Sequence, residues 1–125
     1  MIDRIDHFVL TVADLGATLE FYERVLGFTP KLQKGRPAAL LFGDQKINVH
    51  QADRTFDPKA ARPTVGAGDF CLVTQLPISD VQSRIESLGV KIEVGPIERE
   101  GAKGRMTSIY FRDPDRNLIE VAEYR

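Results

Sequence analysis

The sequence predicts an α+β fold of two tandem βαβββ modules, which form a curved, cup-shaped mixed sheet with helices outside. Three observations lead to this prediction. Runs rich in β-branched and aromatic residues recur along the 125 residues, as in strands. Two stretches carry apolar residues at helical spacing, and Gly follows each of them. The two halves of the chain also repeat the same order of elements.

The first module begins with a strand over residues 5–12, whose side chains alternate between two faces. Asp14 then has the properties of a helix N-cap. Apolar residues follow at helical spacing, at Leu15, Leu19, Tyr22 and Leu26. Gly27 ends this helix as a left-handed glycine would. Three further strands are expected over residues 28–33, 38–42 and 46–51.

The second module repeats this order after a segment that predicts a linker, residues 52–68, where Pro and Gly are frequent and periodicity is weak. A strand over 69–75 precedes a helix over 77–88, which Gly89 ends. Strands are expected over 90–94, 105–112 and 117–121, with a mobile loop over 95–104. We therefore expect a single domain over residues 1–125, with modules at about 4–51 and 69–123.

Composition narrows the class of protein without identifying its function. The formal net charge is −1 and Lys and Arg form no dominant cluster, which argues against nucleic acid or an anionic membrane as partner. No stretch approaches the ~20 apolar residues of a membrane-spanning helix. The acidic start does not resemble a signal peptide. The single cysteine, Cys71, excludes an internal disulfide and fits a reducing cytosol, so a cytoplasmic protein is expected.

Polar residues fall at matching places when the two copies are laid over each other. His7 falls on Asp69, and beyond the last turn of each copy His50 falls on Glu120. The twofold period of a strand gives all four the same parity, so they are expected to point into the cup. The helices would cover the opposite face.

Two imidazoles and two carboxylates are a suitable ligand set for one divalent ion of Zn, Ni, Mn, Co or Fe(II). Two carboxylates also neutralise a doubly charged ion, which lowers the cost of burying the group. Each residue alone has a plainer explanation. A lone His is more often a core or rim residue, Asp69 can belong to a loop, and Glu120 can be a solvated edge residue. Their joint occurrence favours a metal site of His7, His50, Asp69 and Glu120.

Other residues on the same faces have less specific roles. Cys71 shares the face of Asp69 and is expected to be a small packing residue rather than a nucleophile. Three residues share one face of a later strand and either line a pocket or pack in the core: Met106, Ser108 and Tyr110. Residues 101–105 form either a basic lid that meets an anionic substrate or a solvated loop.

The tandem modules, the opening HFVLTV and FYERVLGF segments and the closing DPDRNLIEV segment resemble the vicinal oxygen chelate superfamily. It contains glyoxalase I, extradiol dioxygenases, fosfomycin-modifying enzymes and bleomycin-binding proteins. The resemblance covers essentially the whole chain and extends to FGDQKINVH, FDPKAA and GAKG. One departure is Arg116, where the family motif usually has Gly. The resemblance implies a homodimer and the same four metal ligands.

The resemblance also implies a substrate class: a small oxygenated molecule chelated through vicinal oxygens. The expected activity is that of a divalent-metal lyase or isomerase of glyoxalase type, with Glu120 as the catalytic base and Asp69 as the second candidate. One alternative is an extradiol dioxygenase, although Asp69 stands where that subfamily has its second His. Another alternative is a protein that sequesters a small molecule without catalysis.

Overall fold

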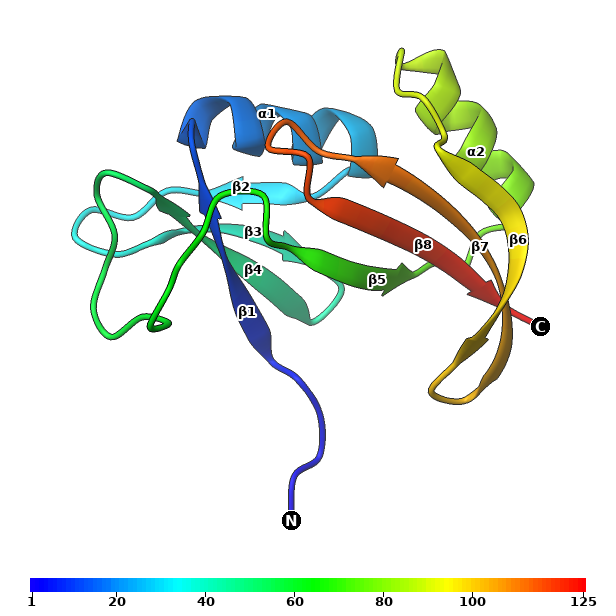
Figure 1. The fold of residues 1–125 in the computed structure, drawn as a ribbon, viewed down its shortest axis with the longest axis horizontal. Coiled ribbons are helices and arrows are strands. Elements are labelled where there is room, and N and C mark those ends of the chain that lie inside the picture. The colour runs from blue at the N-terminus through cyan, green and yellow to red at the C-terminus, as the bar shows by residue number, and fades with distance from the viewer. The chain divides into compact units, whose positions relative to one another are not determined.

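Each half of the chain folds into its own βαβββ unit, as Figure 1 shows in a computed structural model that describes residues 1–125. The units span Met1–Ala67 and Gly68–Arg125. Their elements confirm the predicted tandem modules of the α+β class. None of the helices is both long and apolar enough to span a bilayer.

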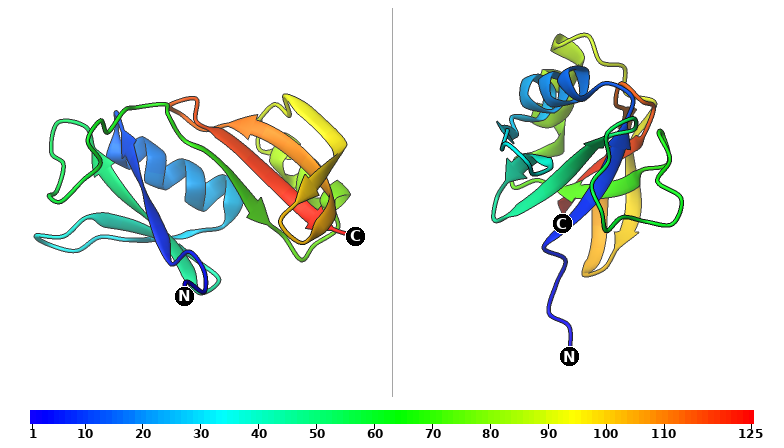
Figure 2. Two further views of the ribbon diagram at one scale, coloured as in Figure 1. Left: turned by 60° about the horizontal axis from the view of Figure 1, so that its bottom comes forward. Right: turned by 90° about the vertical axis from the view of Figure 1, so that its left-hand side faces the viewer.

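The first unit contains one helix and a four-stranded mixed sheet. Its elements are β1 (His7–Val12), α1 (Leu15–Leu26), β2 (Thr29–Lys31), β3 (Ala38–Phe42) and β4 (Gln45–Gln51). The strand order is β1-β4-β3-β2. β1 runs parallel to β4, and the other two pairs are antiparallel. α1 lies along one face of this sheet, which the turned views of Figure 2 show.

The ends of α1 follow from its sequence. The Asp14 carboxylate accepts a hydrogen bond from the Ala17 amide at 3.0 Å, which satisfies one of the free donors of the first turn. Gly27 ends the helix with φ at 73°, a conformation that costs a residue with a Cβ about 1 kcal/mol or more. The apolar face of the helix and one face of the sheet supply the core of this unit, which includes Leu10, Val12, Leu19, Tyr22, Val25, Leu40, Ile47 and Val49.

The second unit repeats this architecture. Its elements are β5 (Asp69–Val73), α2 (Ile78–Ser87), β6 (Val94–Gly101), β7 (Gly104–Arg112) and β8 (Leu118–Tyr124). The strand order is β5-β8-β7-β6, with β5 parallel to β8. Buried residues of this unit include Ile78, Ile85, Ile109, Phe111, Ile119 and Val121. Pro77 offers α2 no side-chain cap, and the Glu123 carboxylate accepts from the Ile78 amide at 2.9 Å instead.

The structure corrects three of the predicted elements. Of the strand expected over 90–94, only Val94 is in a strand, at the start of β6. The expected mobile loop over 95–104 is mostly strand: β6 and β7 form a long hairpin that turns after Gly101. Pro96 obscures this in the sequence, but it lies at a register shift on an edge strand, where a missing N–H is tolerated. The predicted strand over 28–33 is reduced to Thr29–Lys31, because only these residues pair with β3.

Candidate functional site

The face of the second sheet that carries Glu120 carries polar side chains from several strands. On β5, Asp69 and Cys71 pair in register with Leu118 and Glu120 of β8. On the other side of β8, Tyr110 of β7 lies directly opposite Glu120. Cross-strand partners share a face, so the predicted catalytic residues Asp69 and Glu120 lie on one face, offset by two residues, about 7 Å.

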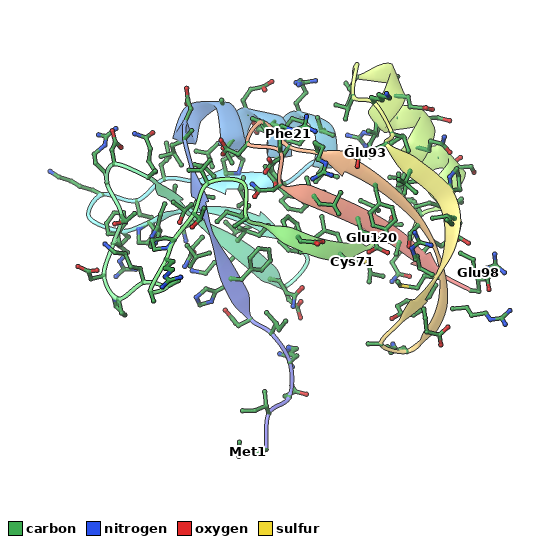
Figure 3. All side chains as sticks on the ribbon, in the orientation of Figure 1. Met1, Phe21, Cys71, Glu93, Glu98 and Glu120 are labelled. Atoms are coloured by element: carbon green, nitrogen blue, oxygen red, sulfur yellow. The ribbon has the colours of Figure 1, made fainter.

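Glu120 lies between two weak acids, Cys71 on one neighbouring strand and Tyr110 on the other. Figure 3 shows Cys71 and Glu120 on adjacent strands. Although Cys71 keeps exposed surface, burial of its thiol and then the charge and hydrogen bonding of Glu120 raise its pKa to about 12. The pKa of Tyr110 is also raised, first by burial and further by Glu120. Both groups therefore stay protonated at neutral pH and can donate to the carboxylate.

A guanidinium extends this cluster. The Arg99 Nε–H donates to the Tyr110 hydroxyl at 3.0 Å, and the Arg99 guanidinium carbon lies 5.5 Å from the centre of the Tyr110 ring. Arg99 is thus hydrogen-bonded to Tyr110, which lies directly opposite Glu120 on the neighbouring strand. Arg99 was not predicted as a site residue, because its segment carries the Pro and Gly residues typical of a loop. Only the pairing register of the β6–β7 hairpin places Arg99 on this face.

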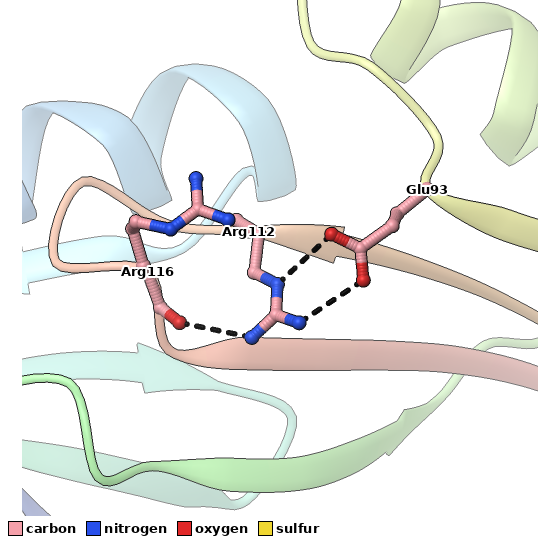
Figure 4. A network of polar contacts seen from close by, with 3 residues as sticks. All are labelled: Glu93, Arg112 and Arg116. Carbon is pink, nitrogen blue, oxygen red and sulfur yellow. Dashed lines mark hydrogen bonds and ion pairs between the residues drawn. The ribbon is translucent and has the colours of Figure 1, made fainter.

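A second arginine on the same face is neutralised. Arg112 donates from Nε and Nη2 to the Glu93 carboxylate at 3.2 and 3.0 Å and from Nη1 to the Arg116 carbonyl, as Figure 4 shows. Its hydrogen bonds are the first cause of the lowered pKa of Glu93, and the same pairing raises the pKa of Arg112. Arg112 therefore positions the turn before β8 rather than binding a ligand.

In the first unit, His7 is accessible and already oriented. Its side chain is 42% exposed, and its Nδ1 lies 2.7 Å from Asp6 Oδ1. This hydrogen bond is the first cause of the lowered pKa of Asp6. A carboxylate on Nδ1 leaves Nε2 as the free nitrogen, which is the arrangement typical of a metal-binding His.

His50 is different, because it is buried. The residue is 3% exposed, and its Nδ1 has no hydrogen-bond partner. The Phe56 ring, from the segment after β4, lies 5.6 Å from the imidazole. Burial, and secondarily the Lys59 charge, lowers the pKa of His50, which favours the neutral ring.

The pairing registers correct the predicted repeat equivalence of His50 and Glu120. His7 pairs with Lys46 on β4, and its counterpart Asp69 pairs with Leu118 on β8. Lys46 and Leu118 are therefore equivalent. Glu120 lies two residues after Leu118, so its equivalent is Asn48, two residues after Lys46. His50 lies four residues after Lys46, so its equivalent is Ala122. The alignment is wrong by two residues, whereas the turn between Arg112 and Leu118 is only one residue longer than that between Leu41 and Lys46, so turn length alone does not explain the error.

The same registers separate the two predicted histidine ligands. His50 pairs with Thr11 on β1, four residues beyond His7, so the two backbones lie about 13 Å apart along the strands. Neither unit alone gathers three or more His, Cys, Asp or Glu side chains at one point. The first unit thus offers an oriented imidazole, and the second offers two carboxylates on one face.

The donor set fits a divalent metal ion in its chemistry. His7 has a free Nε2 fixed by Asp6, and the two carboxylates, Asp69 and Glu120, have hard oxygen donors of the kind that Mn, Fe(II), Zn or Ni accept. Asn48 and His50 lie on the same face of β4 as Lys46, the cross-strand partner of His7, so they share the face of His7. Asn48 was missed as a candidate, and only the register identifies its position.

Comparison with known proteins gives the family. The model of the glyoxalase/bleomycin resistance protein/dioxygenase superfamily matches residues 4–121. The virulence protein STM3117 of Salmonella typhimurium is 55% identical over 124 residues, covering 99% of this chain and 86% of that protein. The glyoxalase domain-containing protein RDO1 of Mycosarcoma maydis is 43% identical over 97% of this chain and 68% of its own length.

Solved structures agree with this result. The crystal structure of the STM3117 protein has a TM-score of 0.97 at 54% identity and covers 100% of this chain and 99% of its own. A lactoylglutathione lyase from Agrobacterium tumefaciens has a TM-score of 0.75 at 25% identity, with 98% and 94% covered. The chain therefore belongs to the glyoxalase/bleomycin resistance protein/dioxygenase superfamily.

Proposed function

We propose that the protein is a divalent-metal-dependent enzyme of glyoxalase type, a lyase or isomerase acting on a small substrate with vicinal oxygens. The observation that carries this proposal is the face around Glu120, where a partly exposed carboxylate has a second acid, Asp69, on the same face and two protonated groups, Cys71 and Tyr110, directly opposite it on the neighbouring strands. A general base held by hydrogen-bond donors is suited to moving a proton on a substrate.

His7, Asp69 and Glu120 are the ligands proposed to hold the ion. His50 remains a fourth candidate, weakened by its register, and Asn48 stands where the repeat would place a ligand. A divalent ion bound there would supply Lewis-acid stabilisation of charge on the two substrate oxygens. The identity of the ion is left open among Zn, Ni, Mn, Co and Fe(II).

Glu120 is proposed to move the proton. A carbonyl makes the neighbouring C–H acidic, so a carboxylate oxygen of Glu120 can accept that proton while the electron pair moves to the carbonyl oxygen. Glu120 then returns this proton to the former carbonyl carbon, while the proton of the neighbouring hydroxyl passes to the former carbonyl oxygen and that hydroxyl carbon becomes the new carbonyl. The isomerisation of an α-hydroxycarbonyl therefore balances with no other reactant. Tyr110, fixed by Arg99, orients Glu120 during both transfers. Asp69 is the second candidate for the base.

The register argues against the dioxygenase alternative. An iron extradiol site uses two His and one carboxylate on one face of the metal. The two histidines of this chain lie about 13 Å apart along paired strands, which does not suit ligation of a single ion. We also propose that the protein is a homodimer, as the family resemblance implies, and that it acts in the cytoplasm, whose reducing conditions suit the single Cys71.

The test is a screen of protein stripped with a chelator and refilled with Ni, Zn, Mn or Fe(II). Methylglyoxal–glutathione adduct, a catechol panel with oxygen uptake, and fosfomycin with a thiol are assayed side by side. The proposal expects metal-dependent turnover of a substrate with vicinal oxygens without oxygen uptake, and its loss in Glu120→Gln. Oxygen uptake would instead establish a dioxygenase. Tight binding of a tested compound to metal-free protein without turnover would establish a sequestering protein.

A further inference from the structure

Arg99 is a guanidinium held on the Glu120 face without a carboxylate partner in its own unit. Its Nε–H donates to the Tyr110 hydroxyl at 3.0 Å and its Nη1 donates to the Glu98 carbonyl at 3.3 Å. Its Nη2 takes part in neither a hydrogen bond nor an ion pair. The other arginine of this face, Arg112, instead forms an ion pair with Glu93. A positioned cation with unused donors is suited to bind an anion.

The path of the Arg99 side chain supports this role. In the register of the hairpin, Arg99 lies opposite Met106, whereas Tyr110 lies opposite Val94. The Arg99 side chain therefore extends along the strand, past the row of Ile97 and Ser108, to reach the Tyr110 hydroxyl. The hydrogen bond and the contact with the aromatic ring hold it in this extended conformation.

A second, independent observation lies in that row. Ser108 is 0% exposed, and its hydroxyl has no hydrogen-bond partner. A buried hydroxyl without a partner costs about 1–3 kcal/mol, so such groups usually have a role. Ser108 shares the face of Tyr110 and Glu120 because it pairs with Ala122 on β8. The face thus carries a guanidinium with unused donors and, two residues along β7 from Tyr110, a buried hydroxyl without a partner.

We infer that Arg99 is the anion-recognition residue of this face, so that the substrate carries a carboxylate or phosphate group besides its vicinal oxygens. The free Nη2 donors of Arg99 bind the anion, and Tyr110 links the bound anion to the orientation of Glu120. That the bound anion is part of a substrate rests on the proposed function. The binding of an anion by Arg99 needs no metal, which allows the two to be tested apart.

The experiment is a titration of chelator-treated, metal-free protein with succinate, with inorganic phosphate and with neutral succinamide, followed by NMR of the Arg99 Nε–H. We expect saturable binding of at least one anion and none of succinamide. Arg99→Met should weaken that binding at least tenfold. The matched control is Arg105→Met, which removes the same charge from the same hairpin. Arg105 lies on the other face of the sheet and pairs with Glu98 at 3.2 Å.

The outcomes separate the two proposals. Equal anion affinity in Arg99→Met and wild type, or no saturable anion binding by wild type, overturns the inference whatever the metal content. Loss in both arginine variants alike shows a general charge effect and also overturns it. Saturable anion binding that only Arg99→Met loses supports it, even if the refilled protein takes up no metal and the proposed enzymatic function fails. Preference for succinate or phosphate identifies the anionic group.

Discussion

Asn48 and Glu120 occupy the same place in the two βαβββ units. Each lies on the last strand of its unit, two residues beyond the partner of the first residue of a parallel edge strand. The first unit therefore has an amide where the second has a carboxylate. An amide oxygen is an uncharged and weaker ligand, so in the proposed metal centre the first unit would contribute mainly through His7.

Asn48→Glu should tighten binding of a divalent ion, because it introduces a second copy of the Glu120 carboxylate at the equivalent position. We expect a gain of about tenfold or more in affinity for Mn or Zn, measured by calorimetry on chelator-treated protein. Asn48→Gln is the matched control and should bring no gain. Equal affinities for the two variants would show that position 48 does not face the ion.

Cys71 should react slowly with alkylating reagents and make stability sensitive to alkaline pH. Its pKa is about 12 in the folded protein, compared with about 8.5 in an unfolded chain. A raised folded-state pKa gives stability that is complete below pH ~8.5 and is lost as pH rises toward 12. Urea unfolding between pH 8 and 11 should show this decline, and Cys71→Ser should reduce it.

Glu120→Gln should make the Cys71 thiol more reactive, which tests how far the carboxylate raises the thiol pKa. The substitution removes the carboxylate charge beside the sulfur, so the pKa of Cys71 falls and iodoacetamide modification at pH 9 becomes faster. Metal-free protein is used in this comparison, so that no bound ion masks the carboxylate. An unchanged rate would indicate that burial alone raises the thiol pKa.

Asp113 is expected to be the most important residue of the turn before β8. Its carboxylate accepts from the Asp115 and Asn117 amides, each at 2.9 Å, and from Asn117 Nδ2 at 2.8 Å. Asn117 Oδ1 in turn accepts from the Gly68 amide at 2.7 Å, next to β5. Asp113→Ala should lower the free energy of unfolding by about 3 kcal/mol, because buried donors lose their partner.

Urea unfolding measures this loss. Asp44→Ala, in the exposed turn of the first unit, is the control and should change the free energy of unfolding by less than about 0.5 kcal/mol. A change of similar size in both variants would mean that the buried network contributes no more than an ordinary turn residue.

Arg116→Gly should stabilise the protein. Arg116 has φ at 67°, a left-handed conformation that costs a residue with a Cβ about 1–2 kcal/mol. Part of the gain is offset by the greater freedom of Gly in the unfolded chain, so we expect a net gain of about 0.5–1 kcal/mol. The Arg112 hydrogen bond is kept, because its acceptor is the Arg116 carbonyl. Arg116→Ala, which retains the Cβ, should bring no gain in thermal unfolding.

Sequence patterns predicted the elements of the fold well where local rules decide them. Asp14 and Gly27 mark the ends of α1 because capping is a local property. The β6–β7 hairpin was missed because Pro96 and several charged residues hide a strand that only pairing with β7 stabilises.

In the candidate site, too, the features set by local sequence were predicted correctly and those set by strand pairing were not. The alternation of side chains in strands placed Asp69, Cys71 and Glu120 on one face, and the register agrees. The alignment of His50 with Glu120 was wrong by two residues because register is fixed by pairing across the sheet, which the sequence does not display. The hydrogen bond from Arg99 to Tyr110 was not predicted for the same reason, because it depends on the register of the β6–β7 hairpin.

The proposed metal centre is tested most directly by counting ions. Protein is stripped with a chelator, refilled with Zn or Ni, dialysed and analysed by elemental mass spectrometry for wild type, His7→Ala, Glu120→Ala and the surface control Arg24→Ala. We predict about one ion per site in wild type and in the control, and loss of nearly all metal in the other two variants. Wild-type protein that retains no metal, or His7→Ala and Glu120→Ala proteins that retain as much as wild type, would contradict the proposal.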